Sequence, residues 1–258
     1  MIDRDYLDRL VRATPVALYA SGIDGARCYW PWRMNKCNGA MGEGARRSHA
    51  AKCDRYVLDS NFRDETVTNR DVLDEAARLG ADAAVLADVY QDMDATVGAL
   101  LDGLGLAADH HYSGTIVLPL QAPHEECYRQ VAASLNREDV WWAIGGQKDA
   151  SAAAKLAATR DLRTAVGTDA HVHGLGFGVT DALARAVRGE PGLLDSLDNA
   201  TAVTNAAYGF DGREEKATIT AAFATAERLR ALRALTPFAD DSPEALRESG
   251  QTGLEELA

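Results

Sequence analysis

Three aspartates follow apolar, strand-like runs of the sequence: Asp59, Asp88 and Asp198. In a barrel of parallel strands the carboxyl ends of all strands meet at one face, and that face makes the active site. Paired carboxylates there suit glycosyl transfer, because one can attack an anomeric carbon while the other moves protons. A single Asp after a strand is more often a helix N-cap. Three of them converging on one face predict a functional site.

Amide and glycine groups follow other strand-like runs. Gln121 comes directly after one run, and Gly145 and Gly146 follow the next. A third carboxylate, together with a Gln amide and glycine N–H groups, can bind the hydrogen-bonding edge of a purine. The glycine-rich run over residues 174–178 has two interpretations. It approaches a phosphate, or it is a tight turn before a helix that has Thr180 as its N-cap.

The elements that position these groups alternate along almost the whole chain. The predicted strands span residues 16–20, 56–60, 83–88, 115–120, 140–144, 170–175 and 193–198, with a weaker eighth at 200–203. Helices are predicted at residues 71–79, 93–104, 124–135, 150–166, 181–187 and 214–232. This alternation predicts an α/β fold of the (β/α)8 TIM-barrel type. The barrel domain is expected over residues 1–235, followed by an acidic, fraying tail over 236–258.

One long segment interrupts the alternation. Residues 21–55 are net positive within an acidic protein, and they also carry Tyr29, Trp30 and Trp32. A long loop in a compact barrel is usually functional or disordered, and aromatic rings beside cations are typical of surfaces that hold nucleic acid. The alternative is a solvated flap whose Trp rings pack on the barrel. The cations predicted to contact nucleic acid are Arg27, Arg33, Arg46, Arg47 and Lys52.

The overall charge limits the partners. The chain of 258 residues has a net charge of −12, from 39 acidic and 27 basic residues, which argues against nucleic acid because phosphate contacts need cations. However, 22 of the basic residues are Arg, whose guanidinium groups fork onto phosphates. No apolar run approaches the roughly 20 residues of a membrane span, and the N-terminus lacks an apolar signal core. A cytoplasmic protein is expected, in the host cytoplasm if the source is viral.

Two groups of residues have the types, but not the pattern, of a metal site. The first would be a zinc site formed by Cys28, Cys37, His49 and Cys53. No C-x-x-C pair is present, so free buried thiols are favoured. His171 and His173 have the H-x-H spacing of metal-dependent barrel hydrolases, but they lie on about the sixth strand and not on the first. We therefore predict no metal and no cofactor, and keep a hydrolase as an alternative.

The order of these motifs along the chain carries a family resemblance. Residues 142–146 (WAIGG), 173–178 (HGLGFG) and 194–198 (LDSLD) match the second half of the family's pattern in order and spacing. Residues 59–62, Asp88 and residues 117–121 match its first half more loosely, so the resemblance covers roughly residues 55 to 210. The chain resembles the queuine and archaeosine tRNA-guanine transglycosylases. It is more similar to their DNA-modifying relatives in phages, archaeal viruses and bacteria.

The resemblance implies a role for each residue on this face. Asp198 is similar to the nucleophile that attacks C1′ of the target nucleoside, expels guanine and forms a covalent glycosyl-enzyme. Asp59 is similar to the carboxylate that assists proton transfer and holds the incoming base, and Asp88 to the acceptor of hydrogen bonds from the base's N–H edge. Strand alternation places Asp195 on the opposite face from Asp198. Further contacts to the base are implied for Gln121, Gly145, Gly146, Ser60 and Phe62.

Departures from the tRNA enzymes favour the DNA branch. No cysteine follows Cys127, so the family's zinc subdomain has no counterpart, and no appended RNA-binding domain is expected. A single Asn61 replaces two glycines beside the base pocket. The expected activity is exchange of guanine in DNA for a free 7-deazaguanine base, with a homodimer left open. The alternatives are a tRNA-guanine transglycosylase, a metal-dependent barrel hydrolase that uses His171 and His173, and a catalytically silent partner subunit.

Overall fold

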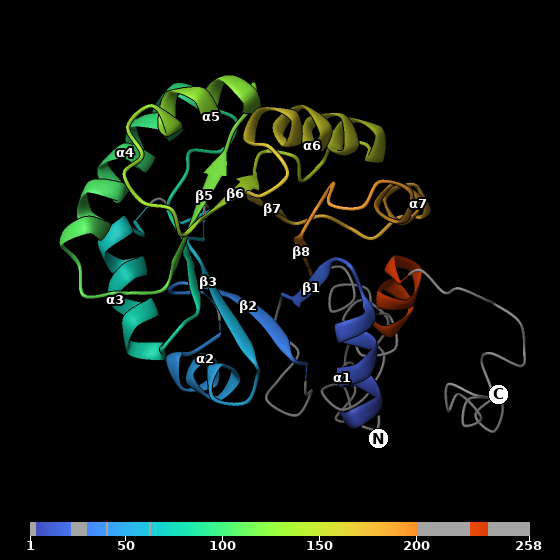
Figure 1. The fold of residues 1–258 in the computed structure, drawn as a ribbon. Coiled ribbons are helices and arrows are strands. Elements are labelled where there is room, and N and C mark those ends of the chain that lie inside the picture. The colour runs from blue at the N-terminus through green and yellow to red at the C-terminus, as the bar shows by residue number, and fades with distance from the viewer. Residues whose placement is uncertain are drawn as a thin grey trace, which may run out of the picture.

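Eight parallel strands form a closed barrel in the computed structural model, which describes residues 4–21, 30–39, 41–61, 63–64, 66–200 and 228–236. The strands follow one another around the barrel in chain order, and β8 pairs with β1 to close it (Figure 1). They are β1 Ala17–Ala20, β2 Trp32–Lys36, β3 Arg55–Asp59, β4 Ala83–Val85, β5 Thr115–Leu120, β6 Val140–Ile144, β7 His171–Gly174 and β8 Ser196–Asn199. The predicted (β/α)8 barrel is confirmed.

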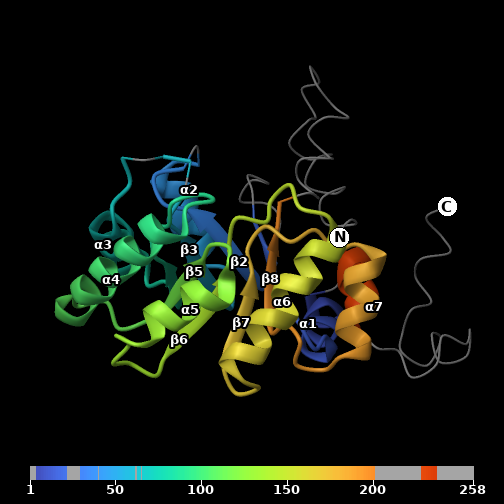
Figure 2. The same cartoon turned by 90° about the horizontal axis from the view of Figure 1, so that it is seen from above.

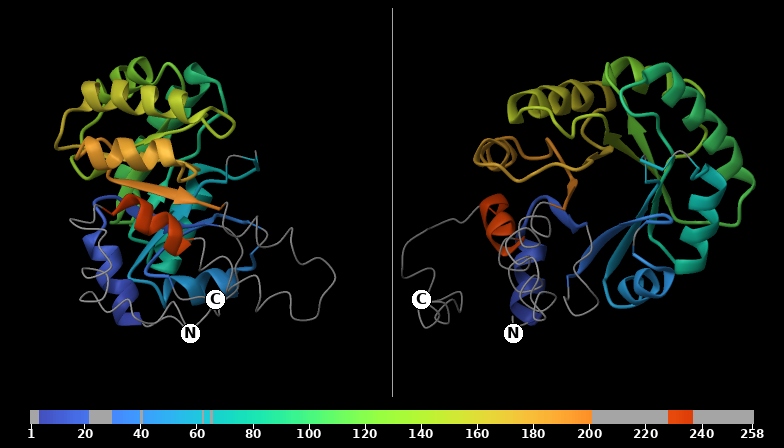
Figure 3. Two further views of the ribbon diagram at one scale, coloured as in Figure 1. Left: turned by 90° about the vertical axis from the view of Figure 1, so that its right-hand side faces the viewer. Right: turned by 180° about the vertical axis from the view of Figure 1, so that it is seen from behind.

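Helices cover the outside of the barrel (Figures 1 and 2). They are α1 Arg4–Ala13, α2 Glu43–Ala50, α3 Asn69–Leu79, α4 Met93–Asp109, α5 His124–Ala132, α6 Ala152–Val166 and α7 Asp181–Gly189, and residues 228–235 are also helical. This last segment lies beside α1 (Figure 3), where the hydroxyl oxygens of Thr14 and Thr236 are hydrogen-bonded at 2.7 Å. The rest of the helix predicted at 214–232 lies outside the described residues. No helix in the described ranges is both long and apolar enough to cross a membrane.

Polar residues fix where the helices begin. The Thr68 side chain accepts a hydrogen bond from Asp71 N, and the Asp71 carboxylate accepts one from Thr68 N, so the two close a capping box at the start of α3. Ser151 caps α6. Thr180 Oγ1 accepts a hydrogen bond from Leu183 N at the start of α7, as the turn interpretation of the glycine-rich run requires. These starts hold the strand-to-helix loops in short, defined paths on one side of the barrel.

Side-chain alternation divides each strand between the barrel interior and the helix layer. Tyr19, Met34, Val57 and Val117 belong to the cluster that fills the interior. Asp59 lies two residues after Val57 on β3, so it shares the inward face at the carboxyl end of the strand. We call the face where the carboxyl ends of the strands meet the carboxyl rim, and the opposite face the amino end.

The segment 21–55 is not one long loop, contrary to the prediction. It contains β2 and α2, and β2 completes the barrel in place of the strand predicted at residues 200–203. Ala200 follows β8, and residues 201–203 lie outside the described part of the chain. Trp30 is fully buried and its Nε1 donates to Leu18 O at 3.0 Å. This ring packs on the barrel, as the alternative interpretation of the segment predicted.

The prediction that Arg46 contacts nucleic acid is wrong, because its side chain is buried between α2 and α3. Arg46 is 4% exposed, and its Nε donates to Glu75 Oε1 at 2.5 Å. Its Nη1 donates to the carbonyl oxygen of Met41. Glu75 Oε2 also accepts from the Cys37 thiol at 3.1 Å. Arg46 therefore neutralises a buried carboxylate and does not reach a phosphate.

The Arg46→Ala substitution should destabilise the protein by about 3–5 kcal/mol, because it leaves the Glu75 carboxylate buried without its cation. Urea unfolding measures this loss. The matched control is Arg47→Ala, one residue along, whose exposed side chain pairs with Glu43 at 3.0 Å. Such a solvent-exposed pair contributes little to stability, so this variant should unfold close to the parent. Equal losses in the two variants would contradict the structural role of Arg46.

Candidate active site

Asp59, Asp88 and Asp198 meet at the carboxyl rim. Asp59 is the last residue of β3, Asp88 follows β4, and Asp198 lies in β8. The charge of Asp198 acts on Asp59, and that of Asp59 acts on Asp88, so the three carboxylates lie within electrostatic range of one another. Lys36, at the end of β2, places its Nζ 3.9 Å from Asp59 Oδ2. The rim therefore combines three carboxylates with one adjacent cation.

Asp198 is held in its ionised form. Its Oδ1 accepts a hydrogen bond from Gly176 N at 2.6 Å, and His173 Nε2 lies 3.6 Å from the same oxygen. Burial by itself would raise the pKa of Asp198, but the His173 imidazole and the Gly176 N–H together hold that pKa below its usual range. The glycine-rich run after β7 thus serves the carboxylate on β8.

Asp195, three residues before Asp198, faces away from the rim. Its Oδ2 accepts hydrogen bonds from Arg163 Nη2 at 2.5 Å and from Val172 N at 2.7 Å. Arg163 lies on α6, in the layer outside the barrel. The two aspartates therefore lie on opposite faces of the strand region, and Asp195 ties β8 to β7 and α6.

The surroundings of Asp59 shift its pKa in the opposite direction from that of Asp198. Its side chain is 18% exposed. Burial raises the pKa of Asp59, and the nearby charge of Asp198 raises it further, while Lys36 and the Asn61 N–H oppose the shift. The protonated form of Asp59 is therefore favoured more than in water. One carboxylate of the pair keeps its charge and the other is disposed to keep a proton.

Asp88, Gln121, Gly145 and Gly146 form a second group on the rim. Gln121 is fully buried; its Nε2 donates to Asp88 Oδ2 at 2.5 Å and its Oε1 accepts from Gln91 N at 3.0 Å. A Cβ on Gly145 would lie 2.7 Å from Gln121 Nε2, and one on Gly146 would lie 2.2 Å from Gln121 Oε1. Both positions favour glycine, because Gly146 has a φ of +68° and a Cβ on Gly145 would also lie 3.0 Å from Leu120 O. Gln121 uses its oxygen and one N–H within the protein, so its first effect is to position Asp88.

Asp88 should lower stability as the pH rises. Burial, then the charge of Asp59, raises the pKa of Asp88 to about 7. The unfolded chain loses this proton near pH 4 and the folded one near pH 7, so the free energy of unfolding falls between these values by on the order of 3 kcal/mol. Asp88→Asn should remove the fall, making the variant more stable than the parent at pH 8 and similar at pH 5.

Urea unfolding at the two pH values measures the effect of Asp88→Asn. The matched control is Asp102→Asn, which changes an exposed Asp on α4 and should leave the pH dependence as in the parent. A parent stability that does not fall between pH 5 and pH 8 would show that Asp88 is ionised throughout.

The remaining predicted base contacts are only partly described. Ser60 is 2% exposed, and its Oγ has no hydrogen-bond partner within the described ranges. Phe62 lies outside the described residues, as does Arg27. The structure therefore brings Asp59, Asp88 and Asp198 together with Gln121 and the two glycines, and leaves Phe62 as a prediction.

Neither candidate metal site assembles among the residues that the structure describes. In the part of the chain that the structure describes, no group of three or more His, Cys, Asp or Glu side chains could hold a metal ion. The Cys37 thiol donates a hydrogen bond to Glu75 Oε2, and His49 Nδ1 lies 3.1 Å from Asn35 Oδ1. Cys28 lies outside the described residues. His171 and His173 both turn a ring nitrogen toward Ser196 Oγ, at 2.6 and 2.7 Å, and not toward a common empty point.

Comparison with protein-family models and with curated proteins gave no match for this chain. Two residues of the site were not predicted as such. Lys36 was counted only among the cations of its segment, and His173 was considered only as a metal ligand. Their signal was the same as that of Asp59 and Asp198, a polar residue on the inward face near a strand's carboxyl end.

The described cations that were predicted to hold nucleic acid do not lie at the rim, and Arg27 is outside the described residues. Arg33 is 2% exposed on the outward face of β2, so the prediction for Arg33 is also wrong. Lys52 lies in the turn before β3, and the last turn of α2 carries Arg47. A helix that returns from the carboxyl end of β2 to the start of β3 brings both residues to the amino end, away from the three carboxylates.

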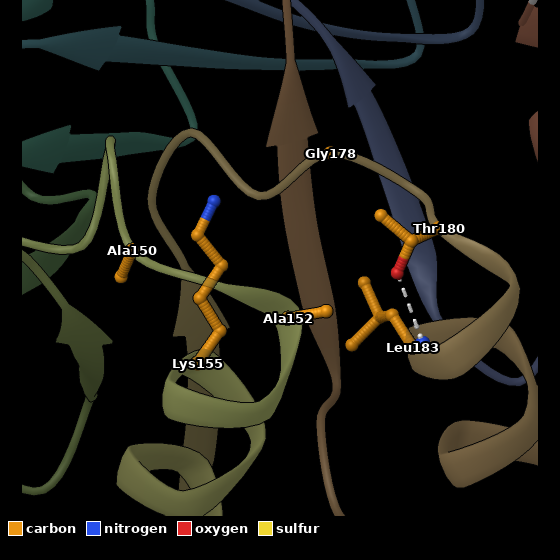
Figure 4. A pocket seen from close by; sticks show the side chains of 6 residues that line it. All are labelled: Ala150, Ala152, Lys155, Gly178, Thr180 and Leu183. Atoms are coloured by element: carbon orange, nitrogen blue, oxygen red, sulfur yellow. Dashed lines mark hydrogen bonds between the residues drawn. The ribbon is translucent and has the colours of Figure 1, made fainter.

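Other cations do lie on rim loops. Lys36 ends β2, Arg63 follows β3, Lys148 follows β6, and Lys155 lies in the first turns of α6. Figure 4 shows Lys155 extending beside a pocket whose opposite wall is formed by Gly178, Thr180 and Leu183.

Proposed function

We propose that this protein exchanges guanine in DNA for a free 7-deazaguanine base by double displacement at C1′. The observation that carries the proposal is the geometry of two carboxylates at the carboxyl rim: Asp198 Oδ1 accepts from Gly176 N at 2.6 Å, and Lys36 Nζ lies 3.9 Å from Asp59 Oδ2. The surroundings lower the pKa of Asp198 and raise that of Asp59. An ionised carboxylate beside a carboxyl group disposed to keep its proton is the arrangement of a nucleophile and a general acid. The resemblance to the guanine transglycosylases assigns the same two roles to the same two residues.

In the first displacement, Asp198 Oδ2 attacks C1′ of the target nucleotide and the bond from C1′ to the guanine nitrogen breaks. The electron pair stays with guanine, and Asp59 gives its proton to the departing base. In the second, the incoming 7-deazaguanine gives a proton to the Asp59 carboxylate as its ring nitrogen attacks C1′ and Asp198 departs. Two inversions at one carbon retain the β configuration. The cycle consumes no cofactor.

The base is bound, in this proposal, by the Asp88 group. A guanine-like base presents two adjacent N–H donors, which suit a carboxylate, and a carbonyl acceptor, which suits backbone N–H groups such as those of Gly145 and Gly146. Gln121 holds Asp88 in place for this contact. Because only the ionised form of Asp88 accepts both donors, a bound base favours loss of the Asp88 proton.

Nucleoside mass spectrometry tests the proposed exchange in cells. DNA and tRNA from cells with and without the gene are digested and compared. A 7-deazaguanine nucleoside that appears only with the gene, and in DNA, is the expected result. The same nucleoside in tRNA alone would make the protein a tRNA-guanine transglycosylase, and its absence from both would contradict the proposal.

The two alternatives from other classes receive less support. A metal-dependent hydrolase needs His171 and His173 as ligands, whereas both rings bond to Ser196. A catalytically silent partner subunit would be free to lose the two carboxylates. Asp59 and Asp198 are both present, and the surroundings raise the pKa of Asp59 and lower that of Asp198.

Nucleic-acid affinity should depend on the rim cations. The double substitution Lys148→Ala with Lys155→Ala should weaken DNA binding and reduce the slope of log K against log salt by about one for each lost phosphate contact. Affinity for the free base should be unchanged, because the Asp88 group is intact. Titrations at several salt concentrations measure both.

The matched control is Arg47→Ala with Lys52→Ala, which removes two cations from the amino end. This variant should keep the parent's salt slope. A reduced slope in the control and an unchanged slope in the rim variant would place the nucleic acid at the amino end, and would restore the original hypothesis for Arg47 and Lys52.

A further inference from the structure

A column of polar side chains runs along the inside of the barrel to Asp198. His171 and His173 lie on the inward face of β7, and Ser196 and Asp198 on the inward face of β8, with His173 in register with Ser196. Ser196 Oγ lies 2.6 Å from His171 Nε2 and 2.7 Å from His173 Nδ1. Ser196 is fully buried and His173 is 1% exposed. A buried chain of this kind must have each of its hydrogens assigned.

One imidazole nitrogen of the column has no hydrogen-bond partner among the described residues. This nitrogen is His173 Nε2, which is buried. The nearest carboxylate atom is Asp198 Oδ1, 3.6 Å away, which already accepts from Gly176 N at 2.6 Å. A bare nitrogen lone pair beside an ionised carboxylate would be repelled. The field of Asp198 therefore favours a hydrogen on His173 Nε2.

We propose that His171, Ser196 and His173 form a hydrogen-bonded column that keeps a hydrogen on His173 Nε2, facing Asp198, and so makes His173 the positioning residue of the nucleophile. The assignment of Asp198 as nucleophile rests on the proposed function, but the hydrogen positions do not.

Counting hydrogens supports this assignment in both charge states of His173. When His173 is neutral, His171 Nε2–H donates to Ser196 Oγ, and the Ser196 hydroxyl donates to His173 Nδ1. When His173 is a cation, its Nδ1–H donates to Ser196, and the hydroxyl donates to a bare His171 Nε2. Both states carry a hydrogen on His173 Nε2. The third arrangement, with that nitrogen bare, places its lone pair against the carboxylate.

The surroundings hold the far end of the column neutral. Burial lowers the pKa of His171 to about 4, and Trp141 of β6 stacks on its ring at 4.0 Å between centroids. The charged groups that act on His171 are Asp195, Arg163 and Arg55, besides His173 itself. Two carboxylates interact electrostatically with His173: Asp198 of β8 and Asp59 of β3. The Tyr19 ring of β1 packs edge-on against the His173 ring, with 6.0 Å between the ring centroids. Asp198 is thus the anion nearest to His173 Nε2.

The first test needs no substitution and no substrate. Heteronuclear NMR of the imidazole nitrogens reports which nitrogen of His173 carries the hydrogen in the free protein. We expect hydrogen on Nε2 throughout the range near pH 7, with Nδ1 bare in the neutral form. Hydrogen on Nδ1 alone would overturn the column as drawn.

The second test follows Asp198. His173→Leu should raise the pKa of the Asp198 carboxyl group by about one pH unit or more, because the N–H that faces the carboxylate is lost. In base exchange, the acid limb of kcat/KM should move to higher pH by the same amount. Ser196→Ala, the milder change, should leave His173 with a mixture of tautomers and a smaller shift. His110→Gln, at the end of α4, is the matched control and should change neither.

The two proposals fail in different ways. An unchanged Asp198 titration in both His173→Leu and Ser196→Ala would overturn the column, even if the protein exchanges bases normally. Absence of base exchange in the parent protein, with the expected NMR result and titration shift, would leave the column standing and overturn the proposed function.

Discussion

The Asp198→Ala variant is expected to lose base exchange by a factor on the order of 10⁴ or more, because it lacks the atom that forms the glycosyl-enzyme. His173 and the Gly176 N–H favour the ionised form of Asp198. The loss should appear as a fall in kcat with no covalent adduct. Binding of the free base should persist, since Asp88 and Gln121 are unchanged. Isotope exchange of labelled guanine into DNA measures the rate.

Asp195→Ala is the matched control for the nucleophile. This carboxylate lies three residues away, but it bonds to Arg163 and Val172 N outside the barrel. Its loss should reduce stability and leave the covalent adduct in place. If Asp195→Ala abolishes the adduct in a folded protein and Asp198→Ala does not, the two roles are reversed.

The Asp59→Asn variant should lose about 10²–10⁴ in rate, the usual contribution of a general acid–base group. The parent's pH profile should be bell-shaped. Its acid limb reports Asp198, which must be ionised and whose pKa is lowered. Its basic limb reports Asp59, which must be protonated for the first displacement and whose pKa is raised by burial. In Asp59→Asn the basic limb should disappear.

Lys36→Met separates the charge of Lys36 from the acid role of Asp59. Lys36 opposes the rise in the Asp59 pKa, so its removal should move the basic limb to higher pH and leave the limb in place. A basic limb that survives in Asp59→Asn would assign the proton transfer to another group, with Asp88 as the next residue to examine.

The barrel was predictable because its strands and helices are marked locally. Runs such as residues 115–120 are apolar along their whole length, as strands buried on both faces must be. The start of α7 is marked by Thr180 before an amphipathic stretch. Helix α1 was missed although Leu7, Leu10 and Val11 have the spacing of a buried helical face.

The strand β2 and helix α2 were not predictable in the same way. Arg33 and Asn35 of β2, and Arg46 and His49 of α2, are buried polar residues at positions where the apolar pattern requires hydrophobic ones. Their partners, such as Glu75 for Arg46, are supplied by tertiary contacts that the local sequence does not show. Because Arg33 and Arg46 are buried, they do not make the nucleic-acid contacts predicted for them.

The candidate site was predictable as far as strand ends can be located. Asp59, Asp88 and Asp198 follow from their positions after apolar runs. The contacts that give them different chemistry do not, because Gly176, His173 and Lys36 come from three loops or strands whose meeting depends on barrel closure. Spacing alone also gave no reason to expect that Gln121 would hold Asp88.

The most direct test of the central claim is to incubate the purified protein with isotopically labelled guanine and with single-stranded DNA, duplex DNA or tRNA, and then to denature it. We predict that label enters DNA and that peptide mass spectrometry finds a nucleic-acid adduct on Asp198. Label in tRNA alone would contradict the choice of DNA. Label in none of the three nucleic acids, together with no adduct on Asp198, would contradict the account of this protein as a base-exchanging glycosyl transferase.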